Sequence, residues 1–404
     1  MKVLIVSHNF WPESFRINDV AAELVAQGCD VTVLTGQPNY PDGDIFPGYR
    51  AWSVRKEHHP AGFDVLRVPS HPRRKGKARD LAMNYLASIF NMAFMGPWLL
   101  RGRKVDVVFV YAPSPVLHAL SALVVAKFKR ARLVTWVQDL WPESLEVTGF
   151  VQSRKVLGSV RKLVSWIYRQ NDLVLAQSQS FVRSITPMAG KTPVIYYPNP
   201  GEAVFSAQPP VSEPPALQLK PGFNVVFAGN LGTVQSLDTI LDAAEILLTR
   251  QEIRFVLVGS GSRLEWLKQQ VQDRGLLNVE LPGRFPVTAM PGLFQQASAL
   301  IMSLVASPIM DQTIPSKLQA YLAAGRPVIA SMNGEGARVV EEAGAGVTCP
   351  AGDAGALARA VSHLADLSKT EQDALGAAAT RYYEQHFEPR MLSRRLIDMF
   401  RELR

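Results

Sequence analysis

Apolar and polar residues alternate along the chain in blocks with two different periods. Short apolar runs such as "KVLIVSH" (2–8) and "CDVTVLTG" (29–36) are typical of buried strands. The segment between them, "INDVAAELVAQG" (17–28), has the spacing of an amphipathic helix that ends at Gly28. The same alternation returns at "DVVFVYAP" (106–113) and "ARLVTWVQD" (131–139). This rhythm of strand and helix predicts an α/β protein with parallel sheets wrapped by helices.

A proline-rich segment interrupts the rhythm near the middle of the chain. Between Pro198 and Pro221 there are seven prolines in 24 residues and no periodicity, which indicates a linker. Strand patterns then resume with "FNVVFAGN" (223–230) and "IRFVLVGSG" (253–261). We therefore predict a first domain at 1–200, a linker at 201–221, a second domain at 222–385, and a last helix at 386–404 that packs back on the first domain. Ligands of such sheets bind beyond the carboxyl ends of the strands.

Length and composition agree with two folded domains. The chain has 404 residues, more than one hydrophobic core usually holds, and it is 47% hydrophobic and 19% charged. Its two cysteines, Cys29 and Cys349, lie far apart and have no disulfide or metal spacing, as expected in a reducing compartment. The N-terminal run "MKVLIVSHNFWPE" predicts a strand and not a signal peptide. We expect a cytoplasmic protein.

The net charge of +8 is concentrated in one region. Between Arg50 and Lys104 there are twelve lysines and arginines against three acids, and "RRKGKAR" (73–79) is the densest part. Such a patch attracts phosphate, whether of nucleic acid, an anionic lipid or a diphosphate substrate; an ordinary solvated face is the alternative. Helix-turn-helix and zinc-finger signatures are missing from the sequence, so nucleic acid is not the expected partner.

An apolar segment of about 20 residues follows this patch. Within 80–100, the polar residues Asn84, Ser88 and Asn91 lie on one helical stripe, and this stripe and Pro97 argue against a transmembrane span. We favour a helix that is partly core and partly in contact with the inner face of the plasma membrane; a wholly buried helix is the alternative. The expected membrane contacts are Arg73, Arg74, Lys75, Lys77, Arg79, Phe90, Phe94 and Trp98.

Three strand-to-helix junctions in the second half can bind phosphate. Gly229 and Gly232 form the first junction, Gly259 lies in the second, and Ser316 begins a helix after Pro315 in the third. Helix N-termini and glycine turns present backbone N–H donors to anions, although a single such junction is common in this type of fold. The second junction, "GSGSRL", lacks the third glycine of a dinucleotide fingerprint, which disfavours a nicotinamide enzyme.

Taken in order, these segments resemble the retaining glycosyltransferases of family 4, which have the two-domain GT-B fold of two Rossmann-like doubly wound domains. The resemblance rests on "AGNLGTVQS", "VGSG", "LPGR", "D-x7-Q" (311–319) and "QAYLAAGRPVIAS" in the second half. In the first half it rests on "FWPES", "GCDVTVLTGQPNYPDG", "VQDLWPES" and "YPNP". Within the family the chain is most similar to bacterial O-antigen and capsule transferases that move N-acetyl-fucosamine-type sugars.

The resemblance implies a donor site with several departures. Asn230 and Gln235 stand where the family has an arginine and a lysine on the donor diphosphate, so we expect Lys317 to supply the cation, with Arg263 or Arg284 behind it. Asp311 and Gln319 stand at the family's two glutamates, which contact the sugar and the ribose. Without the resemblance, Asp311 is an ordinary loop residue and Lys317 a solvated lysine. The implied donor-binding residues are Gly229, Asn230, Gly232, Gln235, Gly259, Arg263, Arg284, Ser316, Lys317 and Gln319.

Candidate residues of the first domain follow two strands. Asp139 is expected to act in catalysis together with Asp311, although Gln138 replaces the family's histidine; in the alternative, Asp139 caps the next turn. His8, Glu13 and Arg16 are expected to bind the acceptor where the family has a glycine-rich loop, or else to cap the first helix.

These features predict a retaining, metal-independent glycosyltransferase without a cofactor. The expected donor is a UDP-sugar, with an N-acetylated amino-deoxy sugar, and the expected acceptor is an undecaprenyl-diphosphate-linked saccharide at an anionic inner-membrane surface. The alternatives are a UDP-sugar epimerase of the same fold and a non-catalytic, donor-binding partner of another transferase.

Overall fold

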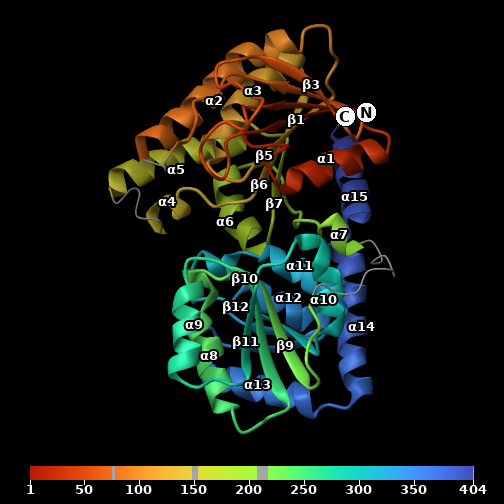
Figure 1. Cartoon of the computed structure of the whole chain (residues 1–404). Helices are drawn as coiled ribbons and strands as arrows, with labels where there is room; N and C mark the ends of the chain where they lie inside the picture. The colour runs from red at the N-terminus through yellow and green to blue at the C-terminus, as the bar shows by residue number, and fades with distance from the viewer. Residues whose placement is uncertain (75–77, 148–152, 207–216, 404) are drawn as a thin grey trace. The chain divides into compact units, whose positions relative to one another are not determined.

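The chain forms two compact α/β units, as the alternating pattern predicts (Figure 1). The structure is a computed structural model that describes residues 1–74, 78–147, 153–206 and 217–403. Unit 1 comprises Met1–Asn199 together with Pro389–Arg404, and unit 2 comprises Pro200–Glu388. Part of the predicted linker, 207–216, lies outside the described residues, and a short helix, α7 (Ala203–Ser206), forms just before it.

Unit 1 contains an eight-stranded sheet with the strand order β3-β4-β2-β1-β5-β6-β7-β8. All neighbouring strands are parallel except β3 and β4, which are antiparallel at the edge. In β1, Val3 and Ile5 point to one face and Leu4 and Val6 to the other, and all four are buried because helices cover both faces. The strands are β1 (Lys2–Ser7), β2 (Asp30–Thr35), β3 (Arg55–His59), β4 (Phe63–Arg67), β5 (Val107–Ala112), β6 (Arg132–Val137), β7 (Leu173–Ala176) and β8 (Val194–Tyr196).

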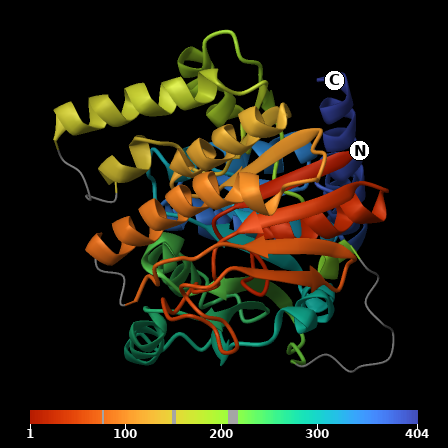
Figure 2. The same cartoon turned by 90° about the horizontal axis from the view of Figure 1, so that it is seen from above.

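Helices cover the unit 1 sheet in two layers. One face packs against α2, α3, α5 and α6, with α2 and α3 side by side in both views (Figures 1 and 2). The other face packs against α1 and the last helix, α15. The helices are α1 (Arg16–Ala26), α2 (Ala78–Leu99), the 3₁₀ turn η1 (Val116–His118), α3 (Ala119–Lys129), α4 (Glu143–Val147), α5 (Arg154–Arg169), α6 (Gln179–Ala189) and α15 (Pro389–Glu402).

Helix α15 belongs to unit 1, although it follows all of unit 2 in sequence. Leu392, Leu396 and Phe400 are fully buried in the core on that face, and the Phe400 ring lies 5.4 Å from the ring of Phe109. The Tyr197 hydroxyl donates a hydrogen bond to the Leu392 carbonyl (3.2 Å). The last helix is therefore part of the unit 1 core.

The polar stripe of α2 faces the interior of unit 1. Asn84 and Ser88 are fully buried, and Asn91 donates a hydrogen bond to the Pro69 carbonyl (2.8 Å). On the opposite side, Phe90 and Phe94 are 67% and 75% exposed. The alternative of a wholly buried helix is therefore wrong, because the polar side chains take the inner positions and leave apolar ones outside. Within the described residues, no helix is long and apolar enough to span a membrane.

Unit 2 contains a six-stranded, fully parallel sheet with the order β11-β10-β9-β12-β13-β14. Its strands are β9 (Phe223–Asn230), β10 (Ile253–Ser260), β11 (Val279–Gly283), β12 (Ala299–Ser303), β13 (Val328–Ser331) and β14 (Gly346–Cys349). Strands β9 and β10 are in register to their ends, with Gly229 opposite Gly259 and Asn230 opposite Ser260. Two of the predicted phosphate-binding junctions therefore meet at the same edge of the sheet.

The unit 2 helices also pack on the sheet, with α8 and α13 in one apolar core with β9 and β10. A capping box of Ser368 and Glu371 fixes the start of α14. The helices are α7, η2 (Thr233–Gln235), α8 (Leu237–Ile246), α9 (Leu264–Asp273), η3 (Val287–Ala289), α10 (Met290–Gln296), η4 (Met310–Gln312), α11 (Ser316–Ala323), α12 (Glu335–Ala343), α13 (Ala354–Asp366) and α14 (Lys369–His386).

Candidate active site

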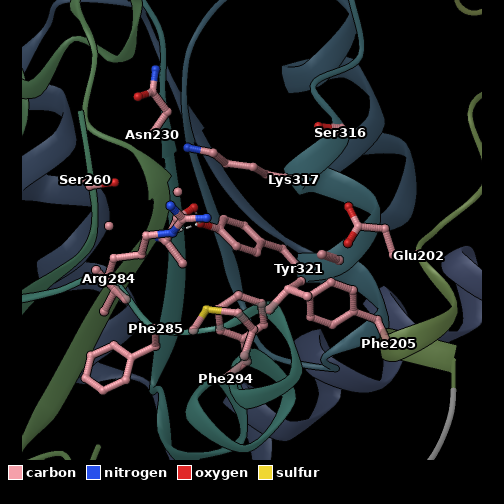
Figure 3. A pocket seen from close by; sticks show the side chains of 17 residues that line it. Glu202, Phe205, Asn230, Ser260, Arg284, Phe285, Phe294, Ser316, Lys317 and Tyr321 are labelled. Carbon is pink, nitrogen blue, oxygen red and sulfur yellow. Dashed lines mark hydrogen bonds between the residues drawn. The ribbon is translucent and has the colours of Figure 1, made fainter. Parts of the chain in front are cut away.

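A cavity of about 420 Å³ opens in unit 2 beyond the carboxyl ends of β9 and β10 (Figure 3). Gly229 and Asn230 of β9 and Ser260 of β10 form one side, and Ser316 and Lys317 at the start of α11 form another. Parallel sheets bind ligands at this edge, and the volume suits a nucleotide. The cavity therefore combines all three of the phosphate-binding junctions predicted from the sequence.

Two glycines make room for the lysine at this edge. Gly229 and Gly259 have φ values of +140° and +150°, which L-residues with a side chain rarely adopt. A Cβ at Gly229 would lie 2.4 Å from Lys317 Cε, and one at Gly259 would lie 1.8 Å from the Gly229 carbonyl oxygen. The glycines are thus needed for close packing between the strand ends and the side chain of Lys317.

Lys317 lies in an apolar setting at the N-terminus of α11. Its Nζ is 3.9 Å from the centroid of the Phe227 ring and donates a hydrogen bond to Gln235 Oε1 (3.2 Å). Burial lowers the pKa of Lys317 to about 7. No side chain caps the N-terminus of α11, where Pro315 is the N-cap residue. An anion bound here would meet both the lysine and the positive end of the helix.

A second, apolar cavity of about 190 Å³ lies on the other side of Lys317. Ser316 and Lys317 line both cavities, while Met302, Leu304 and Met310 form much of the second wall. Asp311 follows Met310 in the turn η4. It is not among the described residues that line the two cavities. Its predicted contact with the donor sugar stays a prediction.

The other predicted donor residues divide into two groups. Asn230, Arg284 and Ser316 line the main cavity, Gln235 lines the second, and Gly232 packs against the Asn230 amide. Arg263 does not line either cavity: it forms an ion pair with Asp238 (2.7 Å) and lies over the Trp266 ring. In this structure Arg263 is paired with Asp238 and lies off the cavity wall, and its predicted support of the diphosphate stays a prediction.

Gln319 is placed away from the cavity surface. It is 1% exposed, and with its amide oriented to suit its neighbours it donates hydrogen bonds to the carbonyls of Ser316 (2.7 Å) and Pro315 (3.1 Å). Unlike a carboxylate, an amide can donate to the carbonyl oxygens of its own helix turn. The structure therefore contradicts the expected ribose contact of Gln319.

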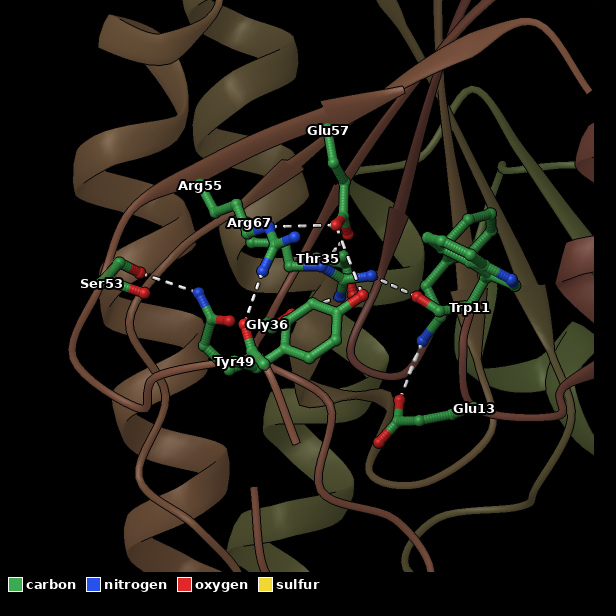
Figure 4. Close-up of polar contacts among 12 residues, drawn as sticks. Trp11, Glu13, Thr35, Gly36, Tyr49, Ser53, Arg55, Glu57 and Arg67 are labelled. Atoms are coloured by element: carbon green, nitrogen blue, oxygen red, sulfur yellow. Dashed lines mark hydrogen bonds and ion pairs between the residues drawn. The ribbon is translucent and has the colours of Figure 1, made fainter. Parts of the chain in front are cut away.

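In unit 1, the buried Glu13 holds loops together, and Figure 4 shows one of the hydrogen bonds that its carboxylate accepts. Its carboxylate accepts hydrogen bonds from the backbone N–H groups of Phe10, Asn39 and Tyr40 and from the Asn9 amide. Burial raises the pKa of Glu13, and these donors oppose the shift. Glu13 thus joins the loop after β1 to the loop after β2, which corrects both its predicted roles, acceptor binding and helix capping.

His8 is also part of the interior of unit 1. Its Nε2 lies 2.7 Å from Asn84 Oδ1 and its Nδ1 lies 3.1 Å from Ser88 Oγ, so the ring fixes the polar stripe of α2. The pKa of His8 is well below its ordinary value, mainly because the ring is buried and secondly because His118 lies nearby. The predicted acceptor role of His8 is corrected accordingly. Arg16 is the first residue of α1. Its positive charge partly opposes the rise in the pKa of Tyr111 that burial causes.

Asp139 lies just beyond the end of β6. Its carboxylate accepts a hydrogen bond from the Ser144 hydroxyl at the start of the next helix, and Ser114 and the Leu140 backbone also bond to it. Burial raises the pKa of Asp139, and these bonds oppose the shift. This geometry matches the alternative of a capped turn, while the catalytic role stays a prediction.

The exposed face of α2 is apolar over several turns. Leu86, Phe90, Phe94 and Trp98 recur every four residues and are 60–75% exposed, and the rings of Phe90 and Phe94 stack. We call these four residues the α2 face. Of the basic residues predicted beside it, Arg73 lies over the Tyr40 ring, Arg74 is 4.0 Å from Asp80, and Arg79 is exposed; Lys75 and Lys77 lie outside the described residues.

Sequence reasoning missed part of the main cavity wall. Glu202 and Phe205 come from the predicted linker, and the Phe205 ring stacks on that of Phe294 at 5.7 Å. Tyr321 lines the cavity and binds the backbone of Ala228. Tyr321 has only the signal of an apolar helix position, and Glu202 has no sequence signal. The described residues contain no group of three or more His, Cys, Asp or Glu side chains that could hold a metal.

Two protein families match the chain over most of its length. Residues 14–200 match the glycosyl transferase 4-like domain, and residues 222–366 match the family described as glycosyl transferases group 1.

Curated relatives include WcaI of Escherichia coli (strain K12), whose name assigns it to colanic acid biosynthesis as a glycosyl transferase. It is 27% identical over 341 residues, covering 80% of this chain and 82% of WcaI. WbjE of Pseudomonas aeruginosa, named as a glycosyltransferase, is 22% identical and covers 80% of each chain.

Solved structures share the fold. Anabaena HepE in complex with UDP superposes with a TM-score of 0.71 at 13% identity over 100% of both chains. Sucrose-phosphate synthase from Thermosynechococcus elongatus gives a TM-score of 0.71 at 16% identity over 100% of this chain and 98% of its own. These likenesses show the GT-B fold, as predicted.

Proposed function

We propose that this chain, a glycosyltransferase of the GT-B type related to enzymes of polysaccharide biosynthesis, transfers a sugar from a UDP-sugar to a lipid-linked saccharide. The observation that carries the donor assignment is the cavity of unit 2, where Lys317 and the uncapped N-terminus of α11 face the glycine-containing ends of β9 and β10. A diphosphate there gains hydrogen bonds from a lysine and from backbone N–H groups. HepE, which shares the fold, is described in complex with UDP and with UDP-glucose.

In the proposed reaction the bond between the anomeric carbon and the β-phosphate oxygen breaks, and the acceptor hydroxyl bonds to the same face of that carbon. The hydroxyl proton passes to the departing phosphate, so the products are UDP and a glycoside with retained configuration. Negative charge grows on the leaving diphosphate, and Lys317 and the α11 N-terminus stabilise it without a metal ion. Asp139 is proposed to orient the acceptor or stabilise the positively charged sugar.

The second cavity supports an N-acetylated amino-deoxy sugar as the group transferred. Its wall contains Met302, Leu304 and Met310, and it adjoins the proposed diphosphate position through Ser316 and Lys317. The methyl group of an acetamido or 6-deoxy sugar would bury the apolar surface of this cavity. A sugar that carries only hydroxyl groups would bury hydroxyls there without hydrogen-bond partners.

The α2 face supports a membrane-bound acceptor. Exposed apolar stripes of this kind mark sites of interaction, and in this chain the stripe ends beside the exposed Arg101 and Lys104. The nearby Arg103 is paired with Asp64 (2.6 Å). Apolar side chains flanked by cations favour the interface of an anionic bilayer. With the exposed Arg101 and Lys104 as the flanking cations, we therefore propose peripheral attachment to the inner membrane, where an undecaprenyl-diphosphate-linked saccharide would be presented.

Nucleotide binding and transfer are tested together. UDP, GDP, dTDP and CDP are added with and without EDTA while the melting temperature is followed; UDP at 100 times its Kd should stabilise folding by about 2.7 kcal/mol. UDP release from UDP-amino-deoxy sugars is then measured with a lipid-linked acceptor. A shift without turnover would favour a non-catalytic donor-binding partner, interconversion of UDP-sugars without acceptor would favour an epimerase, and no shift would refute the donor site.

Membrane attachment is tested by sedimentation with phosphatidylglycerol vesicles. The double variant Phe90→Ser, Phe94→Ser should no longer sediment with the vesicles, because both side chains are exposed and their loss removes apolar contact with the bilayer. Leu277→Ser is the matched control, since Leu277 is 88% exposed and lies in unit 2. Equal sedimentation of the wild type and the double variant would contradict the proposal.

A further inference from the structure

Glu202 occupies a fixed position at the edge of the main cavity. It precedes α7, and the Phe205 N–H donates to the Glu202 carbonyl (2.9 Å). On its other side, the Gly201 N–H donates to the Phe387 carbonyl (2.8 Å), and Gly201 packs so closely on Tyr383 that a Cβ would lie 2.4 Å from its hydroxyl. Residue 202 is therefore anchored from both sides, although it lies between the two segments that match known families.

The side chain of Glu202 lies on the α11 side of the cavity, across from Arg284 and Phe285 (Figure 3). Helices α7 and α11 are in contact, which places Glu202 beside the helix that carries Ser316 and Lys317. Among the described residues that line this cavity, Glu202 supplies the carboxylate, and Lys317 and Arg284 supply the cations.

A nucleoside diphosphate needs three kinds of contact, and the cavity offers three kinds of wall. The diphosphate suits Lys317 and the α11 N-terminus, and a flat base suits the apolar wall that includes Phe285 and Met290. The ribose between them presents two neighbouring hydroxyl groups, which are neutral hydrogen-bond donors. A carboxylate accepts from such a pair with its two oxygens, and charge-assisted bonds of this type are strong.

Gln319 does not provide this contact. The resemblance to family 4 placed the ribose ligand at this position, but the Gln319 amide is buried and bonded to carbonyls of its own helix. We infer that Glu202, from the segment before α7, binds the 2′- and 3′-hydroxyls of the donor ribose in this chain. The inference rests on the proposed donor site and adds a residue that distinguishes ribonucleotides from 2′-deoxyribonucleotides.

The test is a cycle of two changes, one in the protein and one in the ligand. Calorimetry gives the Kd of UDP and of 2′-deoxy-UDP for the wild type and for Glu202→Ala. The wild type should bind 2′-deoxy-UDP about tenfold more weakly than UDP, as expected for the loss of one hydrogen bond to a charged group. Glu202→Ala should bind UDP at least tenfold more weakly and should no longer distinguish the two ligands.

Glu265→Ala is the matched control, because Glu265 is a highly exposed acid of the same unit, at the start of α9, and does not line the cavity. It should behave like the wild type, and melting curves without ligand show whether each variant is folded. The inference is overturned if folded Glu202→Ala binds UDP normally and still prefers it to 2′-deoxy-UDP. If the wild type binds neither ligand, the donor site itself is refuted and the inference is refuted with it.

Discussion

The affinity for UDP should fall as the pH rises above 7, because Lys317 is largely uncharged in the free protein above that pH. Its pKa of about 7 follows from burial, and the ordinary value is 10.5. A diphosphate beside Nζ favours the charged lysine, so binding takes up a proton at any pH between the pKa of the free state and that of the bound state. A nucleotide phosphate loses its last proton near pH 6, roughly, and so contributes little above pH 7.

The size of the effect follows from the protonated fraction. With a pKa of about 7, the lysine of the free protein is half protonated at pH 7 and roughly 1% protonated at pH 9. If the bound lysine stays protonated, the Kd for UDP should therefore rise roughly 50-fold between these two pH values. The sign is unambiguous: the free site has fewer protons than the bound site, so alkaline conditions weaken binding.

Isothermal titration calorimetry at pH 7, 8 and 9, in buffers with different ionisation enthalpies, measures the affinity and the number of protons taken up. The wild type should approach one proton per UDP at pH 9. Lys317→Met should bind more weakly at pH 7, by about 1.5–3 kcal/mol for a hydrogen bond to a charged group, and without proton uptake. A wild-type Kd that is constant from pH 7 to 9, or an unchanged slope in Lys317→Met, would refute this account of the site.

Three further substitutions test other parts of the structure. Glu13→Gln should lower the free energy of unfolding by about 2–4 kcal/mol in urea titrations, because an amide cannot accept from all four N–H groups. Ser14→Ala, at an exposed position, is the control, and equal stability of the two variants would argue against the role of Glu13. Gly229→Ala should weaken UDP binding at least tenfold by displacing the buried lysine, whereas Gly158→Ala, where a Cβ meets open space, should not; normal affinity in Gly229→Ala would contradict the packing argument. Asp139→Ala should reduce the rate of transfer much more than the UDP affinity, and an unchanged rate would leave Asp139 as a cap of the turn that follows it.

The fold was predictable because most of its central strands are short, uninterrupted apolar runs that only a sheet covered on both faces can bury. The edge strand β3, with the sequence RKEHH, has no such run. The donor junctions were predictable for a related reason: the glycines at 229 and 259 end two such strands and precede helices. The orientation of α2 could be predicted only in part. A narrow polar stripe on an apolar helix satisfies the same periodicity whether the stripe meets water or, as with Asn84 and His8, a buried partner.

The errors in the site have one physical origin, which is that the partner of a polar side chain cannot be seen in the sequence. The ion pair between Arg263 and Asp238, 25 residues earlier, has no signal in the sequence. Glu13 looked like an acceptor ligand, yet the backbone of Asn39 and Tyr40 uses its carboxylate. Glu202 was missed because a proline-rich segment without periodicity gives no reason to expect a side chain in a cavity.

Because α15 covers one face of the unit 1 sheet, a ribosome must complete the whole of unit 2 before that face can be closed. Until then the sites of Leu392, Leu396 and Phe400 form an open apolar trough along the nascent first half, and each of these side chains contributes about 1.5–3 kcal/mol when buried. Unit 2, continuous from Pro200 to Glu388, has no such requirement. During translation the later half can therefore finish folding first, and the earlier half exposes this apolar face until the last helix emerges.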